Sequence, residues 1–370
     1  MKFTVERDTI IREIQVAQEI IASRSNMSIL SNVLLQAQDG TLTVRATDLK
    51  VSFETTLPVT VVEPGVTTVF CDKLLGILRS VPSGDIEFEQ NPQNTGENFV
   101  IRPTFKKIDF RLRSIAADKF PEIQTQAPDG YFEIPQEQFI EMVAQTSFAV
   151  SDDETRFFMN GVYVEPDDGK LVMVATDGRR LSYISHDLPK DIGDFQGVII
   201  PPKVLNLVRK LASGEGTLRM AVADKHVFFE FEDHLISSAL IDGQFPNYRR
   251  VIPENQHYQI NLDKTELTEA LKRVSLLVEK SRRIYLELSA GNLQLRSEES
   301  EIGVAREDIP IEYDGPETTI ALNYTYLVDP LRVIGSDAIS VHFTEAGKAI
   351  TIYSEPRENY FHIVMPMQIQ

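Results

Sequence analysis

The sequence predicts an α+β protein made of three similar domains with antiparallel sheets. A short strand-like opening recurs at residues 2–5, 131–134 and 258–261, and each copy runs straight into a stretch with helical periodicity. The repeat is roughly 130 residues long, whereas solenoid repeats run to about 20 to 50 residues. Each copy is therefore a domain, and similar domains placed side by side tend to build arcs and rings.

Other segments recur in the same order. Ala46-Thr47-Asp48 returns as Ala175-Thr176-Asp177, and the segment 118–121 returns as 242–246, with Phe-Pro at the end of both. These matches lie at equivalent points of the first two domains. They indicate a repeated fold rather than a chance similarity of single strands.

The length of the chain supports several domains. A single hydrophobic core usually stops growing at roughly 250 to 300 residues, and this chain has 370. Polar stretches that contain proline, at residues 124–130 and 253–256, are the expected joins. We therefore expect domains at residues 1–127, 128–254 and 255–370.

Each domain is expected to contain two helices. Ile10, Ile14 and Ala17 lie on one face of the first helix, as an amphipathic helix requires. Pro330 should end or kink the last helix, because proline lacks the backbone N–H. The six expected helices span residues 7–24, 72–79, 136–150, 202–211, 264–283 and 324–334.

Short alternating strands fill the remainder of each domain. Typical strands are residues 42–45, 227–231 and 349–353, and turn signals occur at Asp39-Gly40 and Asp168-Gly169. Alternation of apolar and polar residues is typical of strands with one buried face. Two helices among many short strands per domain favour the α+β class.

The charge of the chain is uneven. The formal net charge is −18, which should repel nucleic acid and anionic membranes at long range. The expected helices nevertheless carry a small net positive charge when summed. The excess of Asp and Glu residues therefore lies on strands and loops. Screening keeps charge effects local, so a surface lined by helices could accept phosphates. The alternative is that solvated helices often carry Lys and Arg.

The chain has one cysteine, Cys71, and therefore no intrachain disulfide. It also lacks an apolar segment of the length that a signal peptide or membrane helix needs. We expect a soluble cytoplasmic protein that does not bind membranes.

Catalytic motifs are absent from the sequence. It contains no glycine-rich phosphate loop, paired cysteines, His-Glu-x-x-His helix or Gly-x-Ser-x-Gly elbow, and its six histidines are scattered. The acidic runs 152–154 and 298–301 are typical of solvated loops. Asp48 and Asp177 are interpreted as Asx turns and Cys71 as a packed core residue. We expect no enzyme activity, no cofactor and no metal site.

Three stretches are elaborated beyond their counterparts in the first domain and form a candidate binding site. They are residues 174–181, 244–253 and 362–367. The last one contains Met365-Pro366-Met367, and flexible thioethers can repack around different apolar ligands. The alternative is that these methionines fill the core at the end of a strand.

These stretches, together with residues 1–7 and 28–35, resemble the bacterial DNA polymerase III beta subunit, the sliding clamp family. The resemblance runs from Met1 to about Met367, and Ala-Thr-Asp-Gly-x-Arg-Leu and Phe-Pro-x-Tyr-Arg-Arg-Val are its specific motifs. It implies a head-to-tail homodimer with three DNA-clamp domains per subunit. The ring would place two helices per domain around a central hole and the antiparallel sheets outside. The implied function is that of a DNA polymerase processivity factor, without catalysis.

The resemblance also implies partners and the residues that meet them. A hydrophobic groove between the second and third domains would receive short linear peptides from the replicative polymerase subunit, the clamp loader, repair polymerases and mismatch-repair proteins. Its residues map to Arg156, Met159, Thr176, Gly178, Arg179, Arg180, Leu181, Pro246, Arg250, Val251, Asn323, Tyr326, Ile363, Met365, Pro366 and Met367.

Double-stranded DNA, bound without sequence preference, is the second implied partner. Arg24 matches a family residue that touches DNA. Charge and position on the expected helices add further candidates, namely Lys203, Arg209, Lys210, Lys272, Arg273, Arg282 and Arg283. The subunit joint of the homodimer maps to Lys73, Ile77, Phe110 and Leu112 on one side and to Leu276 and Leu277 on the other. Ordinary core packing is the alternative for these joint residues.

The sequence departs from the family pattern at a few positions. Arg179 stands where some members have His, Phe157-Phe158 where some have Tyr-Tyr, and Gln368 where a basic residue is frequent. The extra cation could tune peptide preference, and the loss of two hydroxyls could alter DNA contacts. A non-enzymatic peptide-binding scaffold that does not encircle DNA is the alternative function. A nuclease or a nucleotide-using enzyme would need a metal cluster or a phosphate loop.

Overall fold

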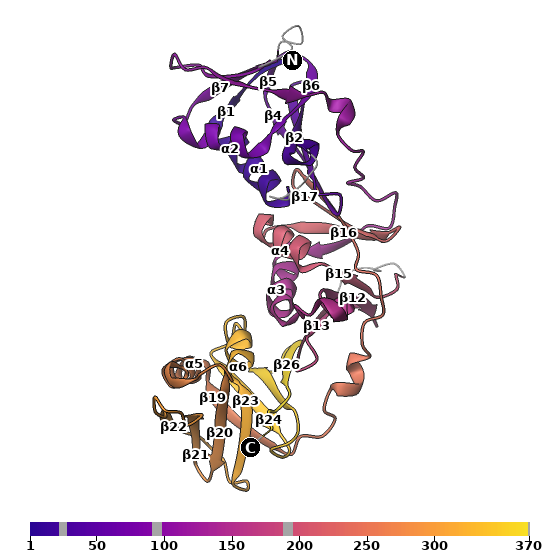
Figure 1. Ribbon diagram of the computed structural model, residues 1–370. Coiled ribbons are helices and arrows are strands. Elements are labelled where there is room, and N and C mark those ends of the chain that lie inside the picture. Colours follow the sequence, from indigo (N-terminus) through magenta and orange to yellow (C-terminus); the bar gives the residue numbers. More distant parts are fainter. Residues whose placement is uncertain (22–27, 91–97, 188–194, 369–370) are drawn as a thin grey trace. The chain divides into compact units, whose positions relative to one another are not determined.

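The structure is a computed structural model that describes residues 1–21, 28–90, 98–187 and 195–368 (Figure 1). Contacts divide the chain into two compact units. The first unit holds residues 1–134 and 217–240, and the second holds residues 135–216 and 241–370.

In its described residues the first unit contains two α-helices and two antiparallel sheets. The five-stranded sheet has the order β5-β1-β7-β8-β9, and the nine-stranded sheet has the order β10-β6-β2-β3-β4-β18-β17-β16-β11. The helices are α1 (Arg7–Ile20) and α2 (Cys71–Ser80). The strands are β1 (Lys2–Glu6), β2 (Asn32–Gln38), β3 (Thr41–Thr47), β4 (Val51–Pro58), β5 (Thr60–Glu63), β6 (Gly65–Phe70), β7 (Asp85–Gln90), β8 (Phe99–Pro103), β9 (Phe110–Leu112), β10 (Ser114–Ile115), β11 (Phe132–Pro135), β16 (Thr217–Ala223), β17 (His226–Phe231) and β18 (His234–Ala239).

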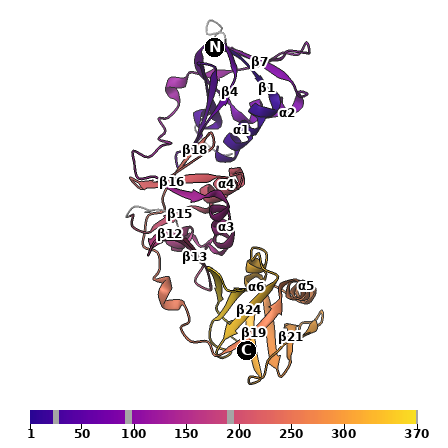
Figure 2. The ribbon, with the colours of Figure 1, turned by 180° about the vertical axis from the view of Figure 1, so that it is seen from behind.

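The two helices of the first unit pack against each other, as the views from the front and from behind both show (Figures 1 and 2). Ile10, Ile14 and Ala17 are fully buried, which confirms the predicted apolar face of α1. Cys71 is also buried, and its Sγ lies 3.8 Å from the carbonyl oxygen of Ile14. Burial, with a smaller effect of Asp72, raises the pKa of the Cys71 thiol to about 12. Cys71 is therefore an unreactive core residue.

The second unit contains an eight-stranded sheet with the order β15-β12-β13-β14-β26-β25-β24-β19 and a four-stranded sheet with the order β22-β21-β20-β23. Its helices are α3 (Gln136–Thr146), α4 (Pro202–Leu211), α5 (Lys264–Val274) and α6 (Tyr324–Leu331). Its strands are β12 (Val162–Asp167), β13 (Lys170–Thr176), β14 (Arg180–Asp187), β15 (Val198–Ile200), β19 (Tyr258–Asp263), β20 (Arg283–Ser289), β21 (Asn292–Ser297), β22 (Arg306–Pro310), β23 (Thr318–Asn323), β24 (Ala338–Phe343), β25 (Ile350–Glu355) and β26 (Tyr360–Val364).

The sheets run across the expected domain boundaries. In the first unit, β18 pairs with β4 from the expected first domain, with Ser238 opposite Val51. In the second unit, β14 pairs with β26 from the expected third domain, with Leu181 opposite Ile363. The expected central domain therefore contributes strands to both units. Its boundaries, like those of its neighbours, remain a proposal.

The repeated Ala-Thr-Asp segment forms the same turn in both units. The Asp48 Oδ1 accepts backbone N–H groups from Lys50 and Val51, at 2.9 and 2.7 Å. The Asp177 Oδ1 accepts those of Arg179 and Arg180, at 2.8 and 3.0 Å. The interpretation of both aspartates as Asx turns is therefore confirmed.

The predicted C-terminal end of one helix is wrong. The helix expected at residues 264–283 stops at Val274 and is followed by the short 3-10 helix η6 (Ser275–Leu277). Arg282 has a left-handed backbone with φ of 53°, and Arg283 begins β20. The apolar residues 276–278 are consecutive rather than spaced by three or four, so a longer helix could not bury them on one face.

The other predicted helices agree more closely with the structure, although the helix expected at residues 136–150 stops at Thr146 and the one expected at residues 324–334 stops at Leu331. Helix α1 begins at Arg7 as expected and ends at Ile20, and Arg24 lies outside the described residues. Helix α6 ends one residue after Pro330. In the described part of the chain, no helix is both long enough and apolar enough to span a bilayer.

Candidate functional site

A groove lies in the second unit, where the β13–β14 turn, the end of β26 and the 3-10 helix η5 (Tyr248–Val251) meet. It has a volume of about 260 Å³ and a predominantly apolar lining. The lining residues are Met159, Thr176, Gly178, Arg179, Arg180, Leu181, Pro246, Asn247, Tyr248, Val251, Ile363 and Met365. An apolar concave site with a few polar groups is typical of a ligand-binding site.

The turn between β13 and β14 forms one wall. Gly178 has φ of 85°, a left-handed conformation that glycine adopts without strain. A Cβ atom at this position would lie 3.0 Å from an Arg156 guanidinium nitrogen. The Thr176 hydroxyl accepts the Gly178 N–H and donates to the Arg180 carbonyl oxygen. The wall is therefore held in one shape by its own hydrogen bonds.

The Arg180 guanidinium is buried behind this wall, with 10% of its side chain exposed. It donates to Asp329 Oδ2 at 2.6 Å, to the Phe148 carbonyl oxygen at 2.6 Å and to Asp177 Oδ2 at 3.2 Å. It also lies over the Tyr326 ring, 4.6 Å from the centroid. Arg180 thus ties β14 to α6 and is not available to pair with an outside charge.

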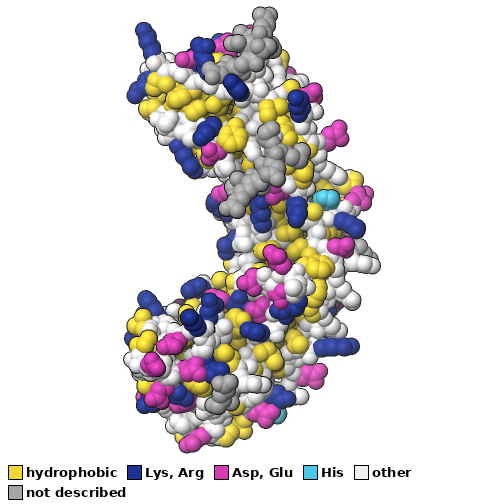
Figure 3. Space-filling model, in the orientation of Figure 1, with side chains coloured by type: hydrophobic (Ala, Val, Ile, Leu, Met, Phe, Trp, Pro, Cys, Tyr) yellow, Lys and Arg dark blue, Asp and Glu magenta, His cyan; other side chains and the backbone are white. Residues whose placement is uncertain are grey.

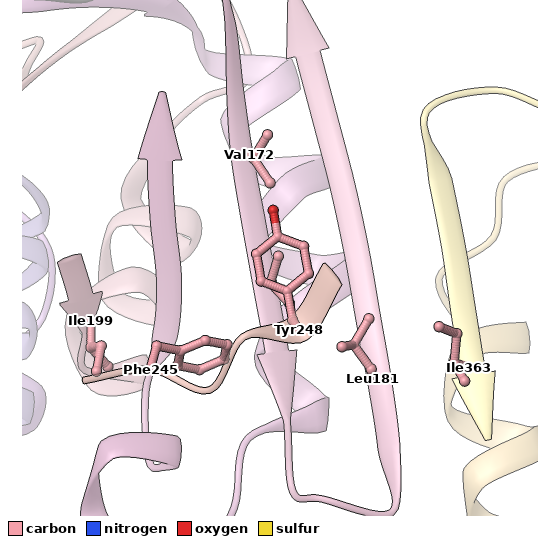
Figure 4. Packing of buried hydrophobic residues seen from close by; sticks show 7 residues of the cluster. Val172, Leu181, Ile199, Phe245, Tyr248 and Ile363 are labelled. Atoms are coloured by element: carbon pink, nitrogen blue, oxygen red, sulfur yellow. The ribbon is translucent and has the colours of Figure 1, made fainter. Parts of the chain in front are cut away.

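The floor of the groove belongs to a continuous apolar cluster. Leu181 of β14 and Ile363 of β26 are buried in it and face the groove. Phe245 stacks on Tyr163 with centroids 4.8 Å apart. In Figure 4 the Tyr248 ring lies between Val172 and Leu181, in front of the strands. Deep packing of this kind gives the groove a preformed shape.

Polar contacts fix the segment that carries Phe245 and Tyr248. The Tyr248 hydroxyl donates to Glu165 Oε1 at 2.7 Å, and Arg249 donates to the same oxygen and to Asp167. Burial, followed by the hydrogen bond to Glu165, raises the pKa of Tyr248 well above its ordinary value. Tyr248 is therefore a neutral donor at physiological pH, and the segment is pinned to β12.

The end of the chain closes the remaining side. The Met365 N–H donates to the Arg179 carbonyl oxygen at 2.8 Å, and the Met367 N–H donates to that of Ala321 at 2.7 Å. Met365 is 45% exposed and Val251 on the opposite side is 52% exposed. Apolar side chains with this exposure at a groove can be covered by a ligand.

The structure brings most of the predicted groove residues together and places a few behind or beside it. Tyr326 stacks on Arg180, and Asn323 caps α6 by accepting the Thr325 N–H at 3.0 Å. Outside the lining residues lie Arg156, Arg250, Asn323, Tyr326, Pro366 and Met367. Sequence reasoning missed Asn247 and Tyr248, although both lie inside the Phe-Pro-Asn-Tyr-Arg-Arg-Val motif, which was the available signal.

The predicted DNA-binding residues have unequal surroundings. On α4, Arg209 and Lys210 are exposed, as is Lys203 at its start. Figure 3 shows dark blue Lys and Arg mixed with magenta Asp and Glu on the face drawn there. Arg273 pairs with Glu307, with Nε to Oε2 at 2.9 Å, and Arg283 pairs with Glu298 at 2.6 Å.

These ion pairs, together with the exposure of each side chain, distinguish the predicted DNA-binding residues from one another. Arg283 has only 13% of its side chain exposed, so it is poorly placed to meet a phosphate. Lys272 is exposed, 3.8 Å from Glu269. Arg282 is exposed in a turn rather than on a helix. The exposed cations Lys203, Arg209, Lys210 and Lys272 therefore stay candidates for a phosphate-facing surface.

The residues expected at a subunit joint lie on the surface of their own units. In the first unit, Phe110 and Leu112 belong to β9, which ends the five-stranded sheet in the described part of the chain. Lys73 is exposed and Ile77 half-buried, both on α2. In the second unit, Leu276 is 81% exposed and Leu277 half-buried, and Ile302 is also exposed.

The acidic run 152–154 has a structural role. Asp153 caps the 3-10 helix η4 (Glu154–Met159) and pairs with Arg156 at 2.9 Å. Hydrogen bonds from Thr155 and then Arg156 hold the pKa of Asp153 below its usual range. Among the residues that the structure describes, no group of three His, Cys, Asp or Glu side chains could hold a metal ion.

Comparisons with known proteins match the whole length of the chain. The family models for the DNA polymerase III beta subunit match in succession, the N-terminal domain at residues 1–124, the central domain at residues 133–247 and the C-terminal domain at residues 249–368. The beta sliding clamp of Treponema pallidum is 44% identical over 375 residues, with 100% of both chains covered.

Solved structures of sliding clamps also match the whole length of the chain. The sliding clamp of Pseudomonas aeruginosa bound to griselimycin superposes with a TM-score of 0.94 at 29% identity, and that of Bacillus subtilis with 0.94 at 26%, each covering 100% of both chains. Repeated α+β domains with a preformed apolar groove define a clamp-type binding protein. The chain belongs to the DNA polymerase III beta subunit family. The alternative of a scaffold that does not encircle DNA is not favoured.

Proposed function

We propose how this chain performs the task of its family. It is a DNA polymerase processivity factor, the sliding clamp, and it works as a ring around duplex DNA. The observation that carries this conclusion is the match of all three family domains in order along one chain. Two copies would join head to tail, and we place the protein in the cytoplasm, where bacterial DNA is replicated.

Retention on DNA would depend on topology more than on affinity. Phosphate contacts weaken steeply as salt rises and carry no sequence information. Cations such as Arg209, Lys210 and Lys272 would therefore give a weak contact that permits sliding. A closed ring, by contrast, leaves circular DNA only when a subunit joint opens.

Apolar side chains that are half-buried or exposed in the single chain would supply that joint. Phe110 and Leu112 alternate along β9, an edge strand that can accept a further strand. Leu276 and Leu277 would lie on the opposing surface of the next subunit. A heterologous joint closes on itself only if the subunits subtend the full turn between them.

The groove would hold short linear peptides of replication and repair proteins. Its apolar floor, Leu181 and Ile363, fits an apolar anchor residue, and Met365 and Val251 can close over it. Polymerases, the clamp loader, repair polymerases and mismatch-repair proteins are the proposed partners. The protein would bind and tether them without catalysis, so we expect the pure protein to hydrolyse neither DNA nor ATP when magnesium is added.

Val251→Lys tests the groove. Val251 is exposed, so a lysine there should leave the fold intact while placing a charge in the apolar site. A fluorescent synthetic peptide with a Leu-Phe pair near its end should bind the unchanged protein and lose at least about tenfold in affinity for the variant. Val62→Lys, at a comparably exposed valine of the first unit, is the matched control. Equal affinity for all three proteins would reject this site.

A further inference from the structure

One wall of the groove is not part of a sheet. Residues 244–252, which the structure describes throughout, supply Pro246, Asn247, Tyr248 and Val251 to the lining but belong to no β-strand. The β13–β14 turn, in contrast, closes a paired hairpin. A segment without strand pairing keeps one position only if its side chains hold it.

A single carboxylate collects the side chains that hold this segment. Glu165 Oε1 accepts the Tyr248 hydroxyl and an Arg249 N–H, both at 2.7 Å. Its Oε2 accepts the Tyr163 hydroxyl at 3.1 Å, and the Tyr163 ring stacks on Phe245 with an angle of 9° between the ring planes. Glu165 therefore supports both aromatic residues of the segment, Tyr248 directly and Phe245 through Tyr163.

The position of Glu165 suits this role. It lies in β12 opposite Val172 of β13, so strand pairing fixes its backbone. Its side chain is 13% exposed, and in the described chain it is not among the residues that line the groove. Alternate residues of a strand point to the same face, which places Tyr163 and Asp167 beside it. Asp167 also binds Arg249, at 3.0 Å, but its side chain is 50% exposed.

A wall that is already in place favours binding, because the ligand does not have to order it. Hydrogen bonds to a carboxylate are stronger than those between neutral groups. Without the charge of Glu165 the segment would leave its position more often. The apparent affinity of a site falls in proportion to the fraction of molecules in which the site is formed.

We propose that Glu165 is a positioning residue for peptide binding. It acts through Tyr248 to hold residues 244–252 in the shape that receives the peptide, and it does not touch the peptide itself. The inference rests on the proposed peptide-binding function and adds to it a residue outside the groove that sets the affinity. The competing role is a purely structural one, in which Glu165 stabilises the second unit and leaves the affinity unchanged.

The experiment compares Glu165→Gln with Glu54→Gln in binding of the fluorescent Leu-Phe peptide. Glu54 is the matched control, because its side chain is 18% exposed and pairs with Arg45 at 2.6 Å on the β3–β4 hairpin of the first unit. Glu165→Gln should weaken peptide binding about fivefold. Glu54→Gln should weaken it less than about 1.5-fold, since distant sites act independently.

Hydrogen exchange followed by mass spectrometry tests the wall in the absence of peptide. The backbone N–H groups of residues 244–252 should exchange at least about threefold faster in Glu165→Gln than in the unchanged protein. Those of β26 should keep their rates in this variant. Glu54→Gln should leave the exchange of residues 244–252 unchanged.

Tyr248→Phe tests the route of the effect. Figure 4 shows the Tyr248 hydroxyl directed away from Leu181, so its removal leaves the floor of the groove in place. This variant should weaken peptide binding about threefold, as expected for the loss of one hydrogen bond. The double variant with Glu165→Gln should lose less than the product of the two single effects, because both changes break the same contact.

The outcomes separate this inference from the proposed function. If the unchanged protein binds no peptide, the groove is rejected and the inference with it. If the peptide binds and Glu165→Gln keeps full affinity, or loses affinity without faster exchange in residues 244–252, the role of Glu165 is overturned while the groove stands. An equal loss in Glu54→Gln, or fully multiplicative effects in the double variant, would overturn it as well.

Discussion

Arg180 shows how one buried charge can shape the groove while its own charge is paired within the protein. Its guanidinium satisfies Asp177 on its own turn, Asp329 of α6 and a carbonyl oxygen near the end of α3. These partners come from three parts of the second unit. The side chain therefore fixes the position of the groove wall relative to α6.

Arg180→Gln should destabilise the second unit by about 3 kcal/mol, because it leaves two carboxylates with little compensation in a site of low exposure. Arg332→Gln is the control, since Arg332 contacts the same Asp329 at 3.5 Å but has 70% of its side chain exposed. We expect the control to change the free energy of unfolding by less than about 0.5 kcal/mol. Urea denaturation measures both, and equal losses would contradict the role given to Arg180.

His362 makes the stability of the second unit dependent on pH. The residue is fully buried, and burial, followed by the charge of Arg180, lowers its pKa from 6.5 to about 3. Between pH 6.5 and pH 3 the His362 side chain binds a proton in the unfolded chain but not in the folded chain. The free energy of unfolding therefore falls as the pH falls from 6.5 toward 3. Above pH 6.5 His362 does not make the free energy of unfolding depend on pH.

We expect His362 to account for about 3 kcal/mol of lost stability between pH 6.5 and pH 4, at about 1.4 kcal/mol for each pH unit. Urea denaturation of the unchanged protein and of His362→Gln across this range measures it. The difference between their free energies of unfolding should shrink as the pH falls. Parallel curves would show that His362 titrates in the folded state as it does when unfolded.

The end of β26 and the residues after it have separate roles. The strand itself, Tyr360–Val364, completes the sheet beside β14. The residues that follow it contribute a groove wall through Met365 and two backbone hydrogen bonds, to Arg179 and Ala321.

A chain that ends at Val364 should therefore fold but bind peptide poorly. We expect an unchanged far-ultraviolet circular dichroism spectrum, because the strand pairing is retained. The affinity for the Leu-Phe peptide should fall by at least about tenfold, since the groove loses one wall. Full affinity in the shortened chain would mean that the groove is formed by the β13–β14 turn and η5 alone.

Sequence reasoning succeeded for elements that depend on local signals. Helices α3, α4, α5 and α6 begin at the residues expected from apolar periodicity, and the Asp177 turn forms as its side chain predicts. The end of α5 was wrong, because apolar periodicity extended the expected helix to residue 283, whereas Arg283 pairs with Asn323 as the first residue of β20.

Long-range contacts were beyond sequence reasoning. The carboxylate that binds the Tyr248 hydroxyl lies 83 residues earlier, and Asp329, the second carboxylate that binds Arg180 besides the nearby Asp177, lies 149 residues later. No local pattern indicates either pairing. Arg180 was therefore predicted as a groove residue on resemblance alone, and its buried ion pairs emerged only from the fold.

The complete dimer can hold DNA by encirclement only if its two subunits close into a ring. If two chains meet through Phe110 and Leu112 on one side and Leu276 and Leu277 on the other, the ring holds DNA by encirclement. A protein that binds only by charge would leave any DNA at high salt, whatever the shape of the DNA. Retention on DNA without ends therefore distinguishes the two modes.

The most direct test loads the labelled protein on a nicked circular duplex with its clamp loader, washes at about 0.5 M salt and then cuts the circle once with a restriction enzyme. The account predicts that the protein stays on the circle through the wash and leaves within minutes of cutting, while a Leu276→Lys variant is never retained. Equal loss from circular and linear DNA during the wash, or retention after the cut, would contradict encirclement.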